Sequence, residues 1–256
     1  MTLTVAAVQH DIVWEDRAAT MAHVVPLIDE AAERGAQLIA LTEMFAVGFS
    51  MSTAHTAEPV EGPSTAFLVD QAARTGAHVC GSVPILGDGD DRPCNTLVVA
   101  GPDGSIDRYA KMHRFTFAGE DRHFAAGSST TTIELGGVRI SLFVCFDLRF
   151  APDFWRLAPD TDAYLVVANW PAARREHWRA LLRARAIENQ AWVVGVNRVG
   201  EGDGIAYTGD SAVIDPLGQV VAEAPENTEI VLVCDIDPAA VADVRTRFPF
   251  LADRTD

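Results

Sequence analysis

The sequence has no apolar run close to the roughly 20 residues that a membrane-spanning helix needs. Its start, MTLTVAAVQHDIVWED, lacks the basic segment and long apolar stretch of a signal peptide, so we expect a cytoplasmic protein that does not bind membranes. Positive charge is scarce as well, with 20 Lys and Arg against 36 Asp and Glu and a formal net charge of −16. Because an acidic surface repels phosphate backbones, we expect no nucleic-acid partner.

Cysteine is also sparse, and the familiar cofactor motifs are missing. The four cysteines are Cys80, Cys94, Cys145 and Cys234. They are far apart and form no CxxC pair, so we expect neither a disulfide framework nor a zinc site. GxGxxG, Walker, GxSxG and HExxH motifs are absent, and we expect no metal and no cofactor. We interpret GEGDG (200–204) as a flexible loop and GDGDD (87–91) as a solvated turn.

Strand-like runs alternate with helical patterns along the chain. Helices are predicted at 16–35, 64–76 and 174–190. Strands are predicted at 3–9, 36–43, 77–85, 95–105, 137–146, 164–170 and 191–199, followed by antiparallel strands within 211–237. Several strands are apolar on both faces, as in sheets that are covered on both sides. With no linker or repeat, the pattern indicates one α/β domain spanning residues 1–256.

Four polar or nucleophilic residues lie where predicted strands end or just beyond. Glu43 follows LIALT, Lys111 follows DRYA, Glu120 lies in AGED, and Cys145 closes ISLFV. Catalytic groups gather at such ends in α/β proteins. Each residue also has a structural interpretation: an ion pair for Glu43, surface charges for Lys111 and Glu120, and a core position for Cys145.

Together these residue types suggest covalent catalysis. A thiol needs a base, and a carbonyl under attack needs a cation or N–H groups at its oxygen. Glu43, Lys111 and Cys145 supply a base, a cation and a nucleophile. His177, on the helix at 174–190, is a less well placed base.

The contexts LTEMF, YAKMH and VCFDLRF, in this order, resemble the nitrilase superfamily of carbon–nitrogen hydrolases. The segment ANWPAARREHWRALLRARAIENQAWVVGVNRVGEGDGIAYTGDSAVIDPLGQVV is similar to the bacterial omega-amidase-like branch. The resemblance covers essentially the whole chain. It implies a four-layer α-β-β-α sandwich in a single domain, and a homodimer.

The resemblance also implies roles for individual residues. Cys145 would be the nucleophile, Glu43 the general base and Lys111 the oxyanion stabiliser. Glu120 would orient Lys111 and the substrate, and the backbone N–H of Phe146 would donate to the oxyanion. The chain departs from the family pattern at Thr42, where Pro is usual, at Phe146, where Tyr is usual, and at Ala151, which precedes a displaced Pro.

The implied activity is that of a thiol-dependent amidase acting on a small carboxamide through a Cys thioester. The branch suggests the omega-amide of a short dicarboxylic 2-oxo acid, such as 2-oxoglutaramate. Its distal carboxylate needs cations, which Arg149, Arg174 and His177 could supply. Arg149 has a structural alternative, pairing with a nearby carboxylate to order its loop.

Aromatic residues are the candidates for the pocket walls. Phe49, Trp170 and Tyr207 are either such walls or core aromatics. Three alternative activities on the same chemistry are an aliphatic amidase, an N-carbamoyl hydrolase and a true nitrilase. A catalytically silent interaction protein on this fold and a redox sensor at Cys145 are alternatives of another class.

Overall fold

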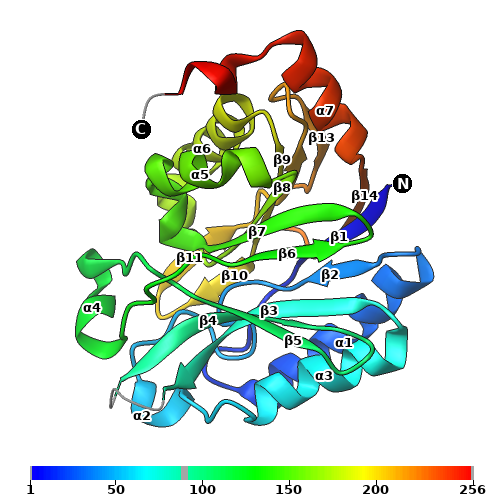
Figure 1. The fold of residues 1–256 in the computed structure, drawn as a ribbon. Helices are drawn as coiled ribbons and strands as arrows, with labels where there is room; N and C mark the ends of the chain where they lie inside the picture. Colours follow the sequence, from blue (N-terminus) through cyan, green and yellow to red (C-terminus); the bar gives the residue numbers. More distant parts are fainter. Residues whose placement is uncertain (1, 88–91, 255–256) are drawn as a thin grey trace.

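Two six-stranded sheets form the centre of the computed structural model, which describes residues 2–87 and 92–254 (Figure 1). The first sheet has the order β14-β1-β2-β3-β4-β5. Its strands are β1 (Leu3–Gln9), β2 (Leu38–Ala40), β3 (His78–Leu86), β4 (Pro93–Ala100), β5 (Ile106–Ala110) and β14 (Ile230–Ile236). Strands β1, β2 and β3 are parallel, and β14, β4 and β5 pair antiparallel to their neighbours.

The second sheet has the order β13-β12-β9-β8-β7-β6. Its strands are β6 (Thr132–Leu135), β7 (Val138–Val144), β8 (Ala163–Ala168), β9 (Trp192–Asn197), β12 (Ala212–Ile214) and β13 (Val220–Glu223). The central strands β7, β8 and β9 are parallel, so their carboxyl ends share one edge. In each sheet the three central strands are therefore parallel, and the outer strands pair antiparallel to their neighbours.

Helices cover the outer faces of the two sheets (Figure 1). The α-helices of the described residues are α1 (Arg17–Glu33), α2 (Thr53–Thr56), α3 (Pro63–Thr75), α4 (Glu120–His123), α5 (Ala151–Leu157), α6 (Arg175–Asn189) and α7 (Pro238–Arg247). Helices α1 and α3 pack on the first sheet, and α5 and α6 lie beside the second. The inner faces of both sheets meet in one apolar core that includes Val5, Leu97, Leu142 and Val194. The predicted α-β-β-α sandwich in a single domain is therefore confirmed.

The structure corrects several details of the predicted elements. The strand predicted at 36–43 is only Leu38–Ala40, and the chain turns before Glu43. The sequence GEGDG is not a flexible loop but the end of a hairpin between β10 (Val199–Gly202) and β11 (Ile205–Thr208). Asp203 and Gly204 both have positive φ, which is the backbone that a two-residue hairpin turn with Asp-Gly favours. The turn predicted at 87–91 lies outside the described residues, apart from Gly87.

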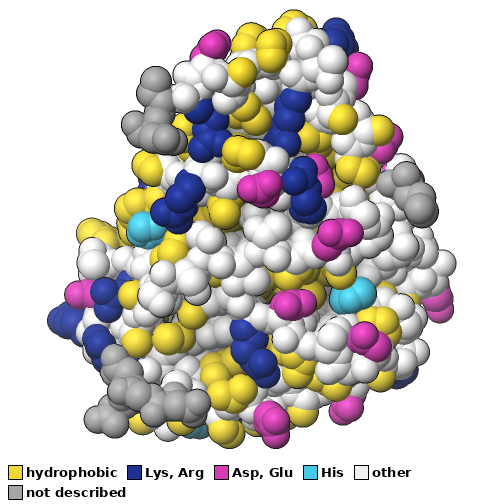
Figure 2. Space-filling model, viewed as in Figure 1, with side chains coloured by type: hydrophobic (Ala, Val, Ile, Leu, Met, Phe, Trp, Pro, Cys, Tyr) yellow, Lys and Arg dark blue, Asp and Glu magenta, His cyan; other side chains and the backbone are white. Residues whose placement is uncertain are grey.

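The surface shows no single-signed face in the view of Figure 2. Acidic and basic side chains are interspersed there with apolar ones, despite the net charge of −16. Within residues 2–87 and 92–254, no helix is both long and apolar enough to cross a bilayer.

Candidate active site

Lys111 lies at the centre of a buried ion cluster that the first sheet provides. Its Nζ is 2.9 Å from Glu43 Oε1 and 2.9 and 3.0 Å from the two carboxylate oxygens of Glu120. Asn95 Nδ2 donates to Glu43 Oε1 at 2.8 Å, and Ser82 Oγ donates to Asn95 Oδ1 at 2.7 Å, which fixes the orientation of the Asn95 amide. Glu43 follows β2 and Lys111 follows β5, so the ends of two strands of the first sheet bring these side chains together. Glu120, the first residue of α4, completes the cluster.

This cluster keeps Lys111 charged. The side chains of Glu43, Lys111 and Glu120 are at most 1% exposed. Burial alone lowers the pKa of Lys111, but the negative charges of Glu120 and Glu43 outweigh it and raise the pKa above its ordinary value. A buried lysine paired in this way is a fixed positive charge at neutral pH.

Cys145 begins the turn that leaves the second sheet. It follows β7 and has a φ of +47°, a left-handed conformation that costs a residue with a side chain on the order of 1–3 kcal/mol. The fully buried carboxylate of Asp147 holds this turn, accepting from Val144 N at 3.0 Å, Tyr109 Oη at 2.8 Å and His113 N at 2.9 Å. Tyr109 and His113 flank Lys111 in sequence, so Asp147 ties the Cys145 turn to the Lys111 strand.

The thiol of Cys145 is protonated in the resting protein. Burial raises its pKa well above the ordinary value, the charge of Glu43 raises it further, and Lys111 opposes the change. Nucleophilic attack by this sulfur therefore requires a base at the moment of reaction. Glu43 is the nearby carboxylate that contributes most to this shift.

Asn169 holds Glu43 from the other sheet. It directly follows β8, its backbone N–H donates to Glu43 Oε2 at 2.8 Å, and its Nδ2 donates to the Glu43 backbone oxygen at 2.5 Å. Glu43 is thus fixed by donors from both sheets. Glu43 and Cys145 belong to different sheets, and these hydrogen bonds hold Glu43 against the end of β8 in the sheet that also carries Cys145.

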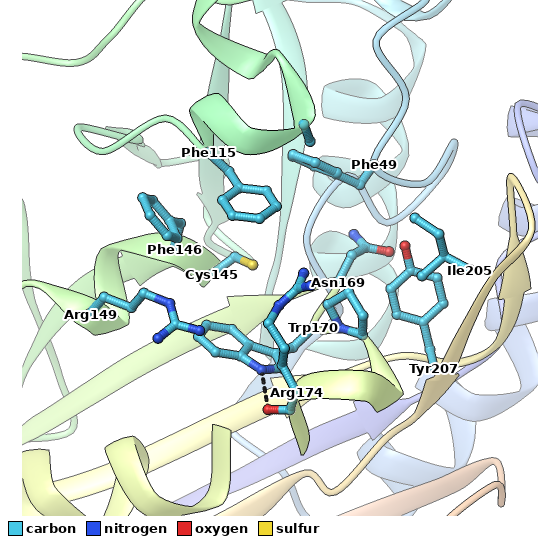
Figure 3. A pocket seen from close by; sticks show the side chains of 12 residues that line it. Phe49, Phe115, Cys145, Phe146, Arg149, Asn169, Trp170, Arg174, Ile205 and Tyr207 are labelled. Atoms are coloured by element: carbon cyan, nitrogen blue, oxygen red, sulfur yellow. Dashed lines mark hydrogen bonds between the residues drawn. The ribbon is translucent and has the colours of Figure 1, made fainter. Parts of the chain in front are cut away.

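An open cavity lies beside Cys145 (Figure 3). Its volume is about 480 Å³, including the space at its entrance that is open to solvent. The structure places six of the seven predicted substrate-binding residues along it: Phe49, Phe146, Arg149, Trp170, Arg174 and Tyr207. The remaining lining residues were not predicted: Phe115, Ala118, Asn169, Pro171 and Ile205. His177 does not line the cavity, but its Nδ1 lies 3.0 Å from Arg149 Nη2.

Arg149 and Arg174 have no carboxylate partner within the part of the chain that the structure describes. Arg149 lies over the Trp170 ring at 4.9 Å, and Arg174 lies over the Phe115 ring at 5.3 Å. Burial, and then the charge of Arg174, lower the pKa of Arg149. Among the described residues, the polar side-chain partner of Arg149 is His177 rather than a carboxylate. The cavity carries two cations that an anionic ligand could neutralise.

Three residues that position the site escaped the sequence prediction: Asn95, Asp147 and Asn169. The strand predicted at 164–170 includes Asn169, but β8 ends at Ala168, so Asn169 lies just beyond a strand end, as Cys145 does. Asp147 lies in the turn that leaves the second sheet and is fully buried, and its place in the sequence does not reveal this burial. Asn95 lies inside β4 and carries no local signal. Among residues 2–87 and 92–254, no group of three or more His, Cys, Asp or Glu is placed to hold a metal ion.

This geometry, a buried thiol beside a carboxylate and a lysine at the junction of two sheets, is that of a thiol-dependent hydrolase. The chain belongs to the carbon-nitrogen hydrolase family, whose model matches residues 4–246, so the resemblance to the nitrilase superfamily is confirmed.

Individual relatives match this chain along nearly their full length. The chain is 41% identical to the omega-amidase YafV of Yersinia enterocolitica, covering 98% of this chain and 96% of that protein. It is 31% identical to the 2-oxoglutaramate amidase of Bacillus subtilis, covering 99% and 98%. The crystal structure of XC1258 from Xanthomonas campestris, a CN-hydrolase superfamily protein with an arsenic adduct in its active site, superposes with a TM-score of 0.94 at 40% identity. That match covers 100% of this chain and 98% of the other.

Proposed function

We propose that the protein is an omega-amidase that hydrolyses the omega-amide of a short dicarboxylic 2-oxo acid, such as 2-oxoglutaramate, to the dicarboxylate and ammonia. The observation that carries this proposal is the pair of arginines in the cavity of Cys145, to which the described residues supply no carboxylate partner. The names of the relatives, omega-amidase and 2-oxoglutaramate amidase, support it.

The chemistry follows from the positions of the buried groups. Glu43 accepts the thiol proton of Cys145 as the sulfur attacks the amide carbon. Lys111 and the N–H of Phe146 stabilise the oxyanion, and Glu120 holds Lys111 in place. Glu43 then gives the proton to the leaving nitrogen, ammonia departs, and a thioester remains. A water molecule, deprotonated by Glu43, hydrolyses the thioester and regenerates the thiol, with no cofactor.

The cavity accounts for the other end of the substrate. Arg149 and Arg174 bind the carboxylate next to the 2-oxo group, since guanidinium groups form strong charge-assisted hydrogen bonds to carboxylates. His177 orients Arg149 from outside the cavity. Phe49, Trp170 and Tyr207 form walls of the cavity around the acyl chain.

The role of Cys145 is tested by Cys145→Ala. We expect this variant to fold with an unchanged circular dichroism spectrum and to release no ammonia from 2-oxoglutaramate. Measurable amidase turnover by the variant would contradict the assignment of Cys145 as nucleophile.

The substrate class is tested with two amides. Ammonia release is measured from 2-oxoglutaramate and from pentanamide, which has the same chain length but no carboxylate. In Arg149→Gln and Arg174→Gln we expect KM for 2-oxoglutaramate to rise by about 10- to 100-fold, the value of a hydrogen bond to a charged group, while kcat/KM for pentanamide stays constant. Arg183→Gln, an exposed position on α6, is the matched control.

The outcomes separate the candidate activities. Equal losses with both amides would contradict a carboxylate-binding role for the arginines. Turnover of pentanamide, of an N-carbamoyl amino acid or of a nitrile, without turnover of 2-oxoglutaramate, would assign one of the related activities. No turnover at all would favour a catalytically silent protein.

We also propose that the protein forms a homodimer, on the basis of the family resemblance. Size-exclusion chromatography with light scattering measures the oligomeric state. A single species at the mass of one chain, 27.6 kDa, would contradict the dimer.

A further inference from the structure

Asn169 carries a buried oxygen without a hydrogen-bond partner in the cavity of Cys145. The residue is 3% exposed and lines that cavity, and in Figure 3 its side chain lies between Cys145 and Tyr207. Among the described residues, seven buried side-chain atoms lack a partner, and Asn169 Oδ1 is the one that belongs to a residue lining this cavity. A buried acceptor left unpaired costs about 1–3 kcal/mol, so this oxygen calls for a donor that the described residues do not supply.

The orientation of the Asn169 amide is fixed. Its Nδ2 donates to the backbone oxygen of Glu43 at 2.5 Å. A flipped amide would place two acceptor oxygens against each other, so Oδ1 must be the atom without a partner. The backbone N–H of Asn169 also holds Glu43 Oε2 at 2.8 Å. Oδ1 therefore belongs to the residue that holds the proposed base, and this residue lines the same cavity as Cys145.

The donor can be identified by its chemistry. The arginines of the cavity are better matched to the carboxylate of the substrate. A primary carboxamide brings two N–H donors to the site, whereas an ester or a nitrile of the same acyl chain brings none. One N–H pointing to Asn169 Oδ1 would turn the nitrogen lone pair, which forms in the tetrahedral intermediate, toward the proton on Glu43.

We propose that Asn169 is a specificity-determining residue whose Oδ1 accepts an N–H of the substrate carboxamide and selects primary amides over esters and nitriles. This inference rests on the proposed amidase function. Sites that hydrogen-bond a substrate N–H discriminate strongly against analogues that lack it, because the buried acceptor is then left unpaired. Asn169 thus contributes to the choice of leaving group, while Arg149 and Arg174 contribute to the choice of acyl chain.

The test compares an amide with the ester of the same acid. The values of kcat/KM are measured for succinamate and for monomethyl succinate in the unmodified protein, in Asn169→Leu and in Asn95→Leu. Both variants remove an Asn amide that donates to Glu43, but Asn95 does not line the cavity. Asn95→Leu therefore measures how a displaced Glu43 changes the two reactions.

We expect Asn169→Leu to lower the amide-to-ester ratio of kcat/KM by about tenfold more than Asn95→Leu does, the value of one lost hydrogen bond to a buried acceptor. Equal ratios in the two variants would show that Asn169 acts only by placing Glu43, and would overturn the inference while leaving the amidase function intact. Absence of ammonia release by the unmodified protein would instead overturn the proposed function, and the inference with it. If Asn169→Leu does not fold, Asn169→Ser removes the same oxygen with a smaller change.

Discussion

His10 should make the protein unstable in mildly acidic solution. The ring is fully buried, its Nδ1 lies 2.7 Å from the Asp11 carbonyl oxygen, and its Nε2 lies 3.1 Å from Thr42 Oγ1. A carbonyl can only accept, so Nδ1 carries the proton and Nε2 accepts from the Thr42 hydroxyl. This neutral tautomer lies against the residue before Glu43, at the position where related proteins usually have Pro.

The magnitude follows from the pKa of the ring. Burial lowers the pKa of His10 from 6.5 to about 4. Above pH 6.5 the ring is neutral in both the folded and the unfolded chain. Below pH 6.5 the ring is protonated in the unfolded chain, whereas in the folded protein it stays neutral down to about pH 4. The free energy of unfolding therefore falls as the pH falls from 6.5 to about 4. The full difference corresponds to about 3.4 kcal/mol, of which about 2 kcal/mol is lost by pH 5.

The measurement is urea unfolding at pH 7, 6 and 5 of the unmodified protein and of His10→Gln, which cannot titrate. Contributions of all other groups cancel in the difference between the two proteins. Between pH 7 and pH 5, we expect the free energy of unfolding to fall by about 2 kcal/mol more in the unmodified protein than in His10→Gln. His55→Gln, at an exposed position, is the control. A difference between the two proteins that does not change with pH would refute the buried neutral His10.

Three further predictions concern the turn and strand that carry the reacting groups. Asp147→Asn removes an acceptor from the Cys145 turn, and we expect steady-state assays to show kcat lower by about tenfold or more, with KM little changed; an unchanged kcat would contradict the bracing role. Gly127→Ala would place a Cβ 2.0 Å from the Ala110 carbonyl oxygen, next to Lys111. We expect it to lower the free energy of urea unfolding by about 1–3 kcal/mol and to lower kcat. Unchanged stability and activity would show that the backbone at Ala110 moves without a free-energy cost. Because burial raises the pKa of Cys145, its alkylation by iodoacetamide, followed by mass spectrometry, should still accelerate above pH 8, and a rate that levels off by pH 7 would indicate a preformed thiolate.

The alternation of strands and helices was predictable because its signals are local, whereas the four-layer sandwich was implied by the family resemblance. Apolar runs bounded by turn residues located the central strands, and the Gly after α3 marked a helix end, where Gly76 indeed has a positive φ. The short helix α5 and the C-terminal helix α7 were not predicted. The amphipathic pattern of α7 is weak, and α5, with seven residues, is too short to show a clear one, so packing against neighbouring elements stabilises both.

The candidate site was predictable only in part, for a related reason. Glu43, Lys111 and Cys145 lie where strands end, which the sequence reveals. Asn95 and Asp147 act through contacts to residues that are 52 and 38 positions away, and no local pattern encodes such pairs. Their importance follows from burial and hydrogen bonding, which depend on how the two sheets pack.

The division of the site between two sheets has a consequence for folding. Glu43 and Lys111 belong to one sheet and Cys145 to the other, and β14, near the end of the chain, completes the first sheet by pairing with β1. During synthesis the first sheet is therefore completed last, and the position of Glu43 relative to Cys145 is set when the two sheets pack together. We expect catalytic activity to report this packing.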